Sequence, residues 1–337
     1  MENETIENVV EIEEKPQYSK FRYGLGAILA FFGFSNKTHG ASKKRQKLVG
    51  DIFTYIILLF GAFIMLYPFW WMLAGSFADT SLGSATEFNS LVWWPSNSTL
   101  TAKNGFFANY QELFSNGFRK FGGKNFSYWR ALGNNLIYSI VPVVVGVITS
   151  ASAAFAFSKI QWVGRNVVFF FLLAAIMVPG PSIMTAQYAM YKSFNMLNGA
   201  ALIVPGLFGS IMTAFFIRQF LFGLPTSIIE AAKIDGAGYF RIFCSFILPL
   251  AMPAIMAQGL LSFMGCWNNY MGSFIFIPSN SDWINLPHAM YLMNTQYSSN
   301  QGPVIAASVV CVLPVIILFA CFQKLIIGSL MLTGSKE

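Results

Sequence analysis

Six long apolar runs without a charged residue constrain this chain more than any other feature. Each has about the 20 residues that a helix needs to cross a hydrocarbon core of roughly 30 Å. The runs are Ile52–Leu73, Leu136–Phe157, Val167–Ala186, Gly199–Ile217, Ile242–Trp267 and Val304–Phe322. Lipid offers no hydrogen-bond partner to an open backbone, so these runs predict an all-α integral membrane protein with about six transmembrane helices.

Composition agrees with this class and suggests three regions. Only 10% of the 337 residues are charged and 55% are hydrophobic, whereas about 25% of the residues in soluble domains are charged. We expect an N-terminal extension over 1–50, a six-helix transmembrane domain over 51–328 and a tail over 329–337. Within the extension, Tyr23–Phe34 is short for a span and favours an interfacial helix, with a seventh span as the alternative.

The distribution of Lys and Arg predicts the orientation. If both termini are cytoplasmic, fifteen of the 21 Lys and Arg residues lie in cytoplasmic segments, as the positive-inside rule requires. The outside segments are then a long loop over 75–135 and a second over 268–303, and the segment 218–241 is cytoplasmic. The net charge of +7 is explained by this topology and by anionic lipid, so we predict no nucleic-acid partner.

Several chemical functions lack the residues that they need. All fourteen Asp and Glu residues lie outside the six runs, so a carboxylate proton relay has no members. No GxxxxGK[ST] phosphate loop occurs, and His39 and His288 are expected to be ordinary surface groups. The four cysteines lie in apolar runs without CxxC spacing, which favours packing. We therefore predict no enzyme activity, no metal site and no cofactor.

One cytoplasmic segment, Leu224–Phe240, has the pattern of a short helix. Pro225 suits its start, and Ser227 with Glu230 has the spacing of a capping box. Gly236 and Gly238 punctuate its end. Its two alanines leave the backbone open to close approach, which favours a docking site for another protein. A capped interhelical loop with no partner is the alternative, and local physics does not separate the two.

This segment resembles the EAA loop of binding-protein-dependent ABC importer permeases. The match comprises Glu230-Ala231-Ala232, Gly236 six positions after the Glu, and Leu248-Pro249. The longer form Glu230–Ala237 is similar to the carbohydrate branch. The resemblance covers about Ile52–Lys336 and is strongest to the smaller permease subunit of maltose-type sugar importers.

Two departures from the family pattern stand out. Phe246 stands where the family usually has Ile, a change that keeps the position apolar. Ala186 stands near a second Pro of many relatives, which leaves open whether the third span is kinked there.

The resemblance implies a type I ABC importer permease fold and transport of a sugar or oligosaccharide into the cytoplasm by alternating access. It implies that a separate cytoplasmic ATPase dimer binds a coupling surface and that an elbow follows it. The implied coupling residues are Glu230, Ala231, Ala232, Asp235 and Gly236. The implied elbow residues are Gly238, Leu248, Pro249 and Pro253. A second permease subunit, an extracytoplasmic solute-binding protein and a bacterial cell membrane complete the implied setting.

The substrate pathway has four candidate residues at the outer end of the fifth run. Trp267, Asn268, Asn269 and Tyr270 offer the aromatic faces and amide groups that bind sugars, although an interfacial aromatic belt is the competing interpretation. Two other functions stay open. One is an ABC permease for a non-sugar solute, and the other is a channel or carrier that works without an ATPase.

Overall fold

The structure is a computed structural model that describes residues 41–78, 106–115, 118–119, 125–296 and 301–334. The run Tyr23–Phe34 and the stretch 79–105 of the predicted loop over 75–135 lie outside these residues. The chain forms two compact units, Met1–Leu66 and Tyr67–Glu337. Helix α2 (Ala41–Gly75) begins in the first unit and ends in the second. The sites discussed below all belong to the second unit.

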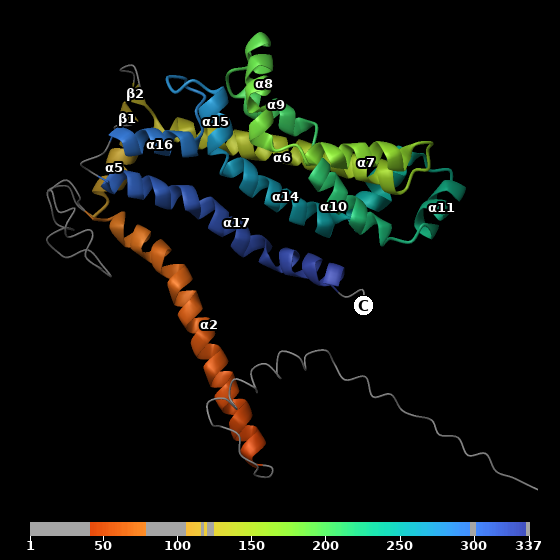
Figure 1. The fold of residues 1–337 in the computed structure, drawn as a ribbon, viewed down its shortest axis with the longest axis horizontal. Helices are drawn as coiled ribbons and strands as arrows, with labels where there is room; N and C mark the ends of the chain where they lie inside the picture. Colours follow the sequence, from red (N-terminus) through yellow and green to blue (C-terminus); the bar gives the residue numbers. More distant parts are fainter. Residues whose placement is uncertain (1–40, 79–105, 116–117, 120–124, 297–300, 335–337) are drawn as a thin grey trace, which may run out of the picture. The chain divides into compact units, whose positions relative to one another are not determined.

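The described residues of the second unit are helical apart from one short strand pair (Figure 1). Strand β1 (Phe118–Arg119) pairs antiparallel with β2 (Asn125–Phe126). The helices after α2 are α5 (Ala108–Ser115), α6 (Tyr128–Ser158), α7 (Arg165–Ile176), α8 (Gly180–Ser193), α9 (Ala200–Leu207), α10 (Ile211–Phe222), α11 (Ser227–Ile234), α12 (Tyr239–Ile242), a π-helical turn (Phe243–Ile247), α13 (Leu248–Leu250), α14 (Met252–Trp267), α15 (Tyr270–Phe276), α16 (Leu286–Gln296) and α17 (Gly302–Gly334).

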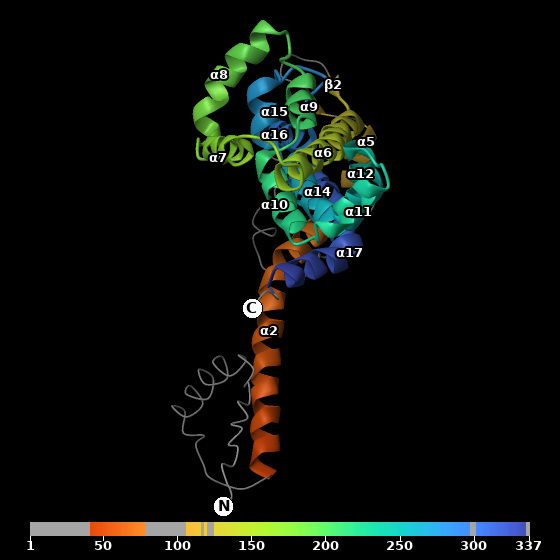
Figure 2. The same cartoon turned by 90° about the vertical axis from the view of Figure 1, so that its right-hand side faces the viewer.

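Helices occupy all six predicted runs, which confirms the predicted class. Among the residues that the structure describes, four segments are long and apolar enough to cross a membrane: Leu48–Gly75, Tyr128–Ser158, Ala200–Phe222 and Gly302–Gln323. The third and fifth runs, each expected as one span, are bent helix pairs. Helices α7 and α8 meet at 95° (Figure 2), and Tyr239–Leu250 meets Met252–Trp267 at 78°.

Proline explains where the first bend falls. Pro179 has the extended backbone of a residue that precedes a helix, and Pro181 follows in the first turn of α8. A proline has no N–H to donate and cannot continue the preceding helix. Ala186 lies seven residues beyond this bend, inside α8, and the helix is not interrupted there.

Helix α6 is the centre of the unit and contacts α9, α10 and α14. Its crossing with α9 is close because small residues meet there. A Cβ atom on Gly146 would collide with the carbonyl oxygen of Gly206, and a Cβ atom on Gly206 would lie 2.5 Å from that of Pro142. Small residues allow such backbone approach in membrane helices, where packing replaces the hydrophobic effect as the driving force.

The same stretch of α6 also forms hydrogen bonds with the backbone at the break between α9 and α10. The break follows Leu207 and contains Gly209, whose φ of +82° favours glycine. The Thr149 hydroxyl lies 3.0 Å from the carbonyl of Leu207 and 2.8 Å from that of Val145 in its own helix, so its one proton is shared between the two carbonyls. The amide of Ser210 donates to the Ser150 hydroxyl oxygen over 2.9 Å. Backbone groups freed by the break are thus satisfied by α6, as a hydrocarbon environment requires.

The segment 268–303, predicted as an outside loop, contains two helices, α15 and α16, which make up half of it. We call α15, α16 and the turn between them the cap. Its residues form a core with α5, α6, α14 and α17. The fully or nearly buried members from the cap are Ile277, Ile284, Leu286, Ala289, Leu292 and Met293. Their spacing in α16 follows a helical face, so the segment folds by burying apolar surface.

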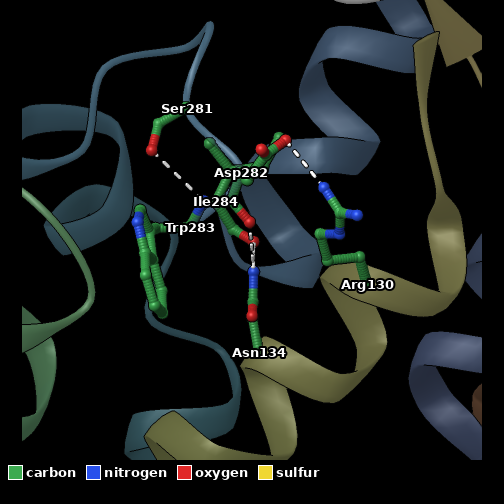
Figure 3. A network of polar contacts seen from close by, with 6 residues as sticks. All are labelled: Arg130, Asn134, Ser281, Asp282, Trp283 and Ile284. Atoms are coloured by element: carbon green, nitrogen blue, oxygen red, sulfur yellow. Dashed lines mark hydrogen bonds and ion pairs between the residues drawn. The ribbon is translucent and has the colours of Figure 1, made fainter.

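A row of polar side chains on α6 holds the cap in place, and Figure 3 shows two of them, Arg130 and Asn134. Arg130, Asn134 and Tyr138 are spaced by four residues and so share one helix face. The Asn134 amide donates to the carbonyls of Asp282 and Ile284 over 2.8 and 3.0 Å. The Tyr138 hydroxyl donates to the carbonyl of Trp283 over 2.8 Å. Arg130 lies 3.0 Å from the Asp282 carboxylate, and both side chains are exposed.

His288 is fully buried in the cap, so the expectation of an ordinary surface group is wrong. Its two ring nitrogens lie 3.2 Å from the Ser273 hydroxyl and 3.3 Å from the Ser279 hydroxyl. Its amide donates to the Asn285 side chain over 3.1 Å. Burial lowers the pKa of His288 from 6.5 to about 4, so the ring is neutral at pH 7 and joins α16 to α15.

The close crossing of α6 and α9 predicts that a methyl group added at Gly146 destabilises the protein. Gly146→Ala should lower the free energy of unfolding by about 1–3 kcal/mol, because the new methyl group meets backbone. Gly133→Ala on the same helix is the control, since a Cβ atom there meets nothing within 4 Å. Reversible unfolding in mixed detergent micelles measures both, and equal stabilities would show that the crossing is looser than described.

The polar side chains on α6 are predicted to contribute unequally to the free energy of unfolding. Asn134→Ala should cost about 1–3 kcal/mol of unfolding free energy, because two carbonyls lose their donor. Arg130→Ala should cost less than about 1 kcal/mol, because an exposed ion pair contributes little. The same unfolding assay decides between them, and a larger loss for Arg130→Ala would contradict this assignment.

His288 predicts a pH dependence of stability with a defined sign. Its folded pKa lies below its unfolded pKa, so the unfolded chain binds more protons between pH 6.5 and about 4. The contribution of His288 is therefore complete above pH 6.5 and is lost as the pH falls toward 4. Melting curves at pH 7.5 and 5 should separate more for the wild type than for His288→Asn. Equal separations would count against a buried neutral ring.

Candidate functional site

Helix α11 is short and amphipathic and contains the motif Glu230-Ala231-Ala232. Ile229 and Ala232 are buried in a second core with residues of α6, α10 and α14. Glu230 and Ala231 are exposed on the other side. The helix is therefore fixed to the bundle by one face and accessible to another molecule by the other. Figure 1 shows α11 at the end of α6 opposite the cap.

The predicted capping box at the start of α11 is not formed. Thr226 occupies the N-cap position with helical backbone angles, and no side chain caps the helix. Ser227 lies inside the first turn, one position too late to cap it. Spacing alone predicted the box, and the turn at Pro225 places the helix start one residue earlier than that spacing requires.

The end of α11 gives Gly236 a physical role. Its amide donates to the carbonyl of Lys233 over 3.0 Å, and the amide of Ala237 donates to the carbonyl of Ala232 over 2.9 Å. This pair of bonds is the Schellman motif, which needs a left-handed residue between helix and exit. Gly236 has a φ of +76°, so glycine is favoured there. Asp235 precedes it as an exposed carboxylate.

Two exposed apolar side chains beside this turn were missed by the sequence analysis. Ile234 is 86% exposed and Phe240 is 82% exposed. Such exposure of large apolar groups marks contact sites when it is grouped with a polar rim. Lys233 belongs to that rim and donates to the Tyr239 hydroxyl over 3.0 Å. In the sequence, the signal for the two apolar side chains was that Ile234 precedes, and Phe240 follows, the pair Gly236 and Gly238.

The predicted elbow residues lie around the 78° bend. Gly238 is the N-cap of α12 with an ordinary φ of −70°, so the backbone does not need glycine there. A π-helical turn over Phe243–Ile247 leads into Leu248, which packs against the second core. Pro249 and Pro253 lie on either side of the break at Ala251. The bend thus combines a π-turn with two prolines, both common causes of sharp kinks.

The four pathway candidates have different surroundings at the other end of α14. Trp267 is fully buried, and its indole N–H donates to the carbonyl of Cys311 over 2.9 Å, so in this conformation it packs α14 against α17. Asn269 caps α15 by accepting from the amide of Gly272 over 3.0 Å. Asn268 is exposed and Tyr270 is half-buried.

Tyr270 belongs to an aromatic cluster that the sequence analysis did not identify. Its ring lies 5.3 Å from that of Phe274 and 5.5 Å from that of Tyr291, measured between centroids. Phe274 is four residues after Tyr270, a spacing that could have been noticed. Tyr291 comes from α16 and had no local signal. Within the described residues, no three His, Cys, Asp or Glu side chains are close enough to hold a metal.

Comparison with known proteins gives a consistent set of relatives. Residues 143–330 match the family model of the binding-protein-dependent transport system inner membrane component. The arabinooligosaccharides transport system permease protein of Halalkalibacterium halodurans is 32% identical over 210 residues, which are 62% of this chain and 75% of that protein. The trehalose/maltose transport system permease protein of Thermococcus litoralis is 27% identical over 289 residues, 83% of this chain and 96% of that protein.

A solved structure extends the comparison to the fold. A chain of a bacterial ABC transporter that imports the acidic polysaccharide alginate matches with a TM-score of 0.67 at 21% identity. The match covers 86% of this chain and 99% of the other, which confirms the predicted permease fold. With α11, the bent fifth span and the matched family region in one unit, the chain belongs to the family of binding-protein-dependent transport system inner membrane components.

Proposed function

We propose that this chain is the permease subunit of an ATP-driven importer that moves a sugar or oligosaccharide into the cytoplasm by alternating access. The observation that carries the proposal is α11, a short helix fixed by Ile229 and Ala232 with an exposed motif. ATP hydrolysis is assigned to a separate cytoplasmic ATPase dimer. The chain itself supplies a transport pathway.

The exposed side of α11 suits a protein partner. Glu230 and Asp235 offer carboxylates, Ala231 leaves the backbone accessible, and Ile234 and Phe240 offer apolar surface. Apolar anchors within a polar rim are the usual composition of a protein interface. Gly236 fixes the direction in which the chain leaves this surface. A push by the ATPase on α11 would therefore reach the bundle through its buried face.

The distribution of Lys and Arg supports a cytoplasmic α11 and an outward cap, with both termini in the cytoplasm. In this orientation the cap is the surface that an extracytoplasmic solute-binding protein would meet. A second permease subunit completes the pathway, since the fold neighbour is one chain of a larger transporter. A bacterial cell membrane is the setting that the relatives support.

The substrate class rests on the relatives and on the residue types of the pathway. The names of two relatives specify arabinooligosaccharides and trehalose or maltose. The six runs contain no Lys or Arg, which favours a neutral solute over an anion. The candidate residues for the substrate pathway are still Asn268, Asn269 and Tyr270. Trp267 fixes the end of α14 from which they follow by its hydrogen bond to Cys311 of α17. A non-sugar solute, or a carrier without an ATPase, is the competing function.

The exposed motif predicts a loss of coupling. In the importer reconstituted with its partners, Glu230→Lys and Gly236→Asp should each lower ATP-driven uptake at least about tenfold, since coupling energies are about 1–3 kcal/mol. Glu230→Lys reverses a charge on the docking surface, and Gly236→Asp strains the Schellman turn. Uptake of labelled arabinotriose, maltose and trehalose into ATP-loaded proteoliposomes measures the effect.

The exposed Lys192 on α8 supplies the control, because Lys192→Glu also reverses a charge but lies far along the chain from α11. It should transport as the wild type does. Normal uptake by both α11 variants would refute a coupling role. Uptake by the wild-type chain without an ATPase would instead favour a carrier.

A further inference from the structure

The end of α6 nearest α11 is held by cations from two other segments. The last carbonyls of a helix lack partners inside it. The Arg218 guanidinium donates to the carbonyl of Phe157 over 3.1 Å. The Arg165 guanidinium donates to the carbonyl of Ser158, the last residue of α6, over 3.4 Å and to that of Ile160 just beyond the helix over 3.1 Å. Cations are also favoured at this end of a helix by its dipole, so the end of α6 is well fixed.

Lys159, the C-cap residue of α6, directs its ammonium group away from α6, toward the connection between α10 and α11. Its ammonium donates to the carbonyl of Leu224 over 2.6 Å. Leu224 lies in the four-residue connection between α10 and α11, directly before Pro225. Burial lowers the pKa of Lys159, which indicates that the ammonium is partly removed from water. A charge-assisted hydrogen bond in such surroundings is stronger than one at the open surface.

This bond completes the attachment of α11 to α6. The buried face of α11 packs in the second core with Phe155 of α6 and with Ile160 just beyond its end. Apolar packing resists separation but permits sliding, because it has no direction. A hydrogen bond does have a direction. Lys159 therefore fixes the position of the connection along α6, which the apolar contacts alone would leave adjustable.

The other end of α6 holds the cap through Asn134 and Tyr138. One continuous helix of 31 residues thus joins the α11 attachment to the cap. We propose that Lys159 is a positioning residue for energy coupling: its bond to Leu224 makes α11 and α6 one rigid body, so that displacement of α11 moves the cap. This inference rests on the proposed function.

The test uses the complete importer with its partner subunits and follows both ends of α6 by hydrogen–deuterium exchange. ATP with vanadate should change exchange at 227–237 and at 286–296 in the wild type. In Lys159→Met, which keeps the length but loses the donor, the change at 227–237 should persist. The change at 286–296 should fall at least about fivefold. Lys159→Arg restores a donor and should restore the change in the cap.

Lys192→Met is the matched control and should behave as the wild type. An undiminished cap response in Lys159→Met, or no recovery in Lys159→Arg, would overturn the proposal. So would a Lys159→Met chain that no longer joins the complex, because its role would then lie in folding. A wild-type complex with no response to ATP at either end would refute the proposed function itself, which separates the two failures.

Discussion

The structure depends on one constraint: every backbone N–H and C=O that enters hydrocarbon needs a partner inside the protein. Continuous helices satisfy it by themselves, but this chain interrupts its spans. The break between α9 and α10 survives because Thr149 and Ser150 of α6 bond to Leu207 and Ser210. The two hydroxyls lie on the helix that the break crosses most closely, so the interruption and its remedy occur at one place.

Helix α6 connects the cap with the region around α11. Its N-terminal end holds the backbone of the cap through Asn134 and Tyr138. Its middle crosses α9 at Gly146, and its C-terminal end packs in the second core with residues of α10 and α11. Each contact uses a different chemistry: polar side chains at the first end, close backbone approach in the middle, and cations at the other end. A helix held in these three ways resists bending, which suits a part that transmits movement.

The bent spans, unlike α6, contain breaks at which they can bend. Pro179 ends α7, and Pro249 and Pro253 surround the break before α14, so these spans consist of two rigid pieces with a joint. The π-helical turn before Leu248 adds a second irregularity on the α11 side. A fold that combines one continuous helix with jointed neighbours can change its opening while most of its packing is kept. Such a combination suits hinge and shear movements between packed helices.

The sequence by itself determined the six apolar runs, the short helix with Glu230 and the glycine at its exit, because these depend on hydropathy and on local backbone preference. It did not determine the cap, which was expected as a loop, or the burial of Trp267 and His288. It also missed Lys159, whose acceptor is 65 residues away. Only the tertiary structure decided these features, because the partners come from distant segments and local periodicity contains no information about which segments meet.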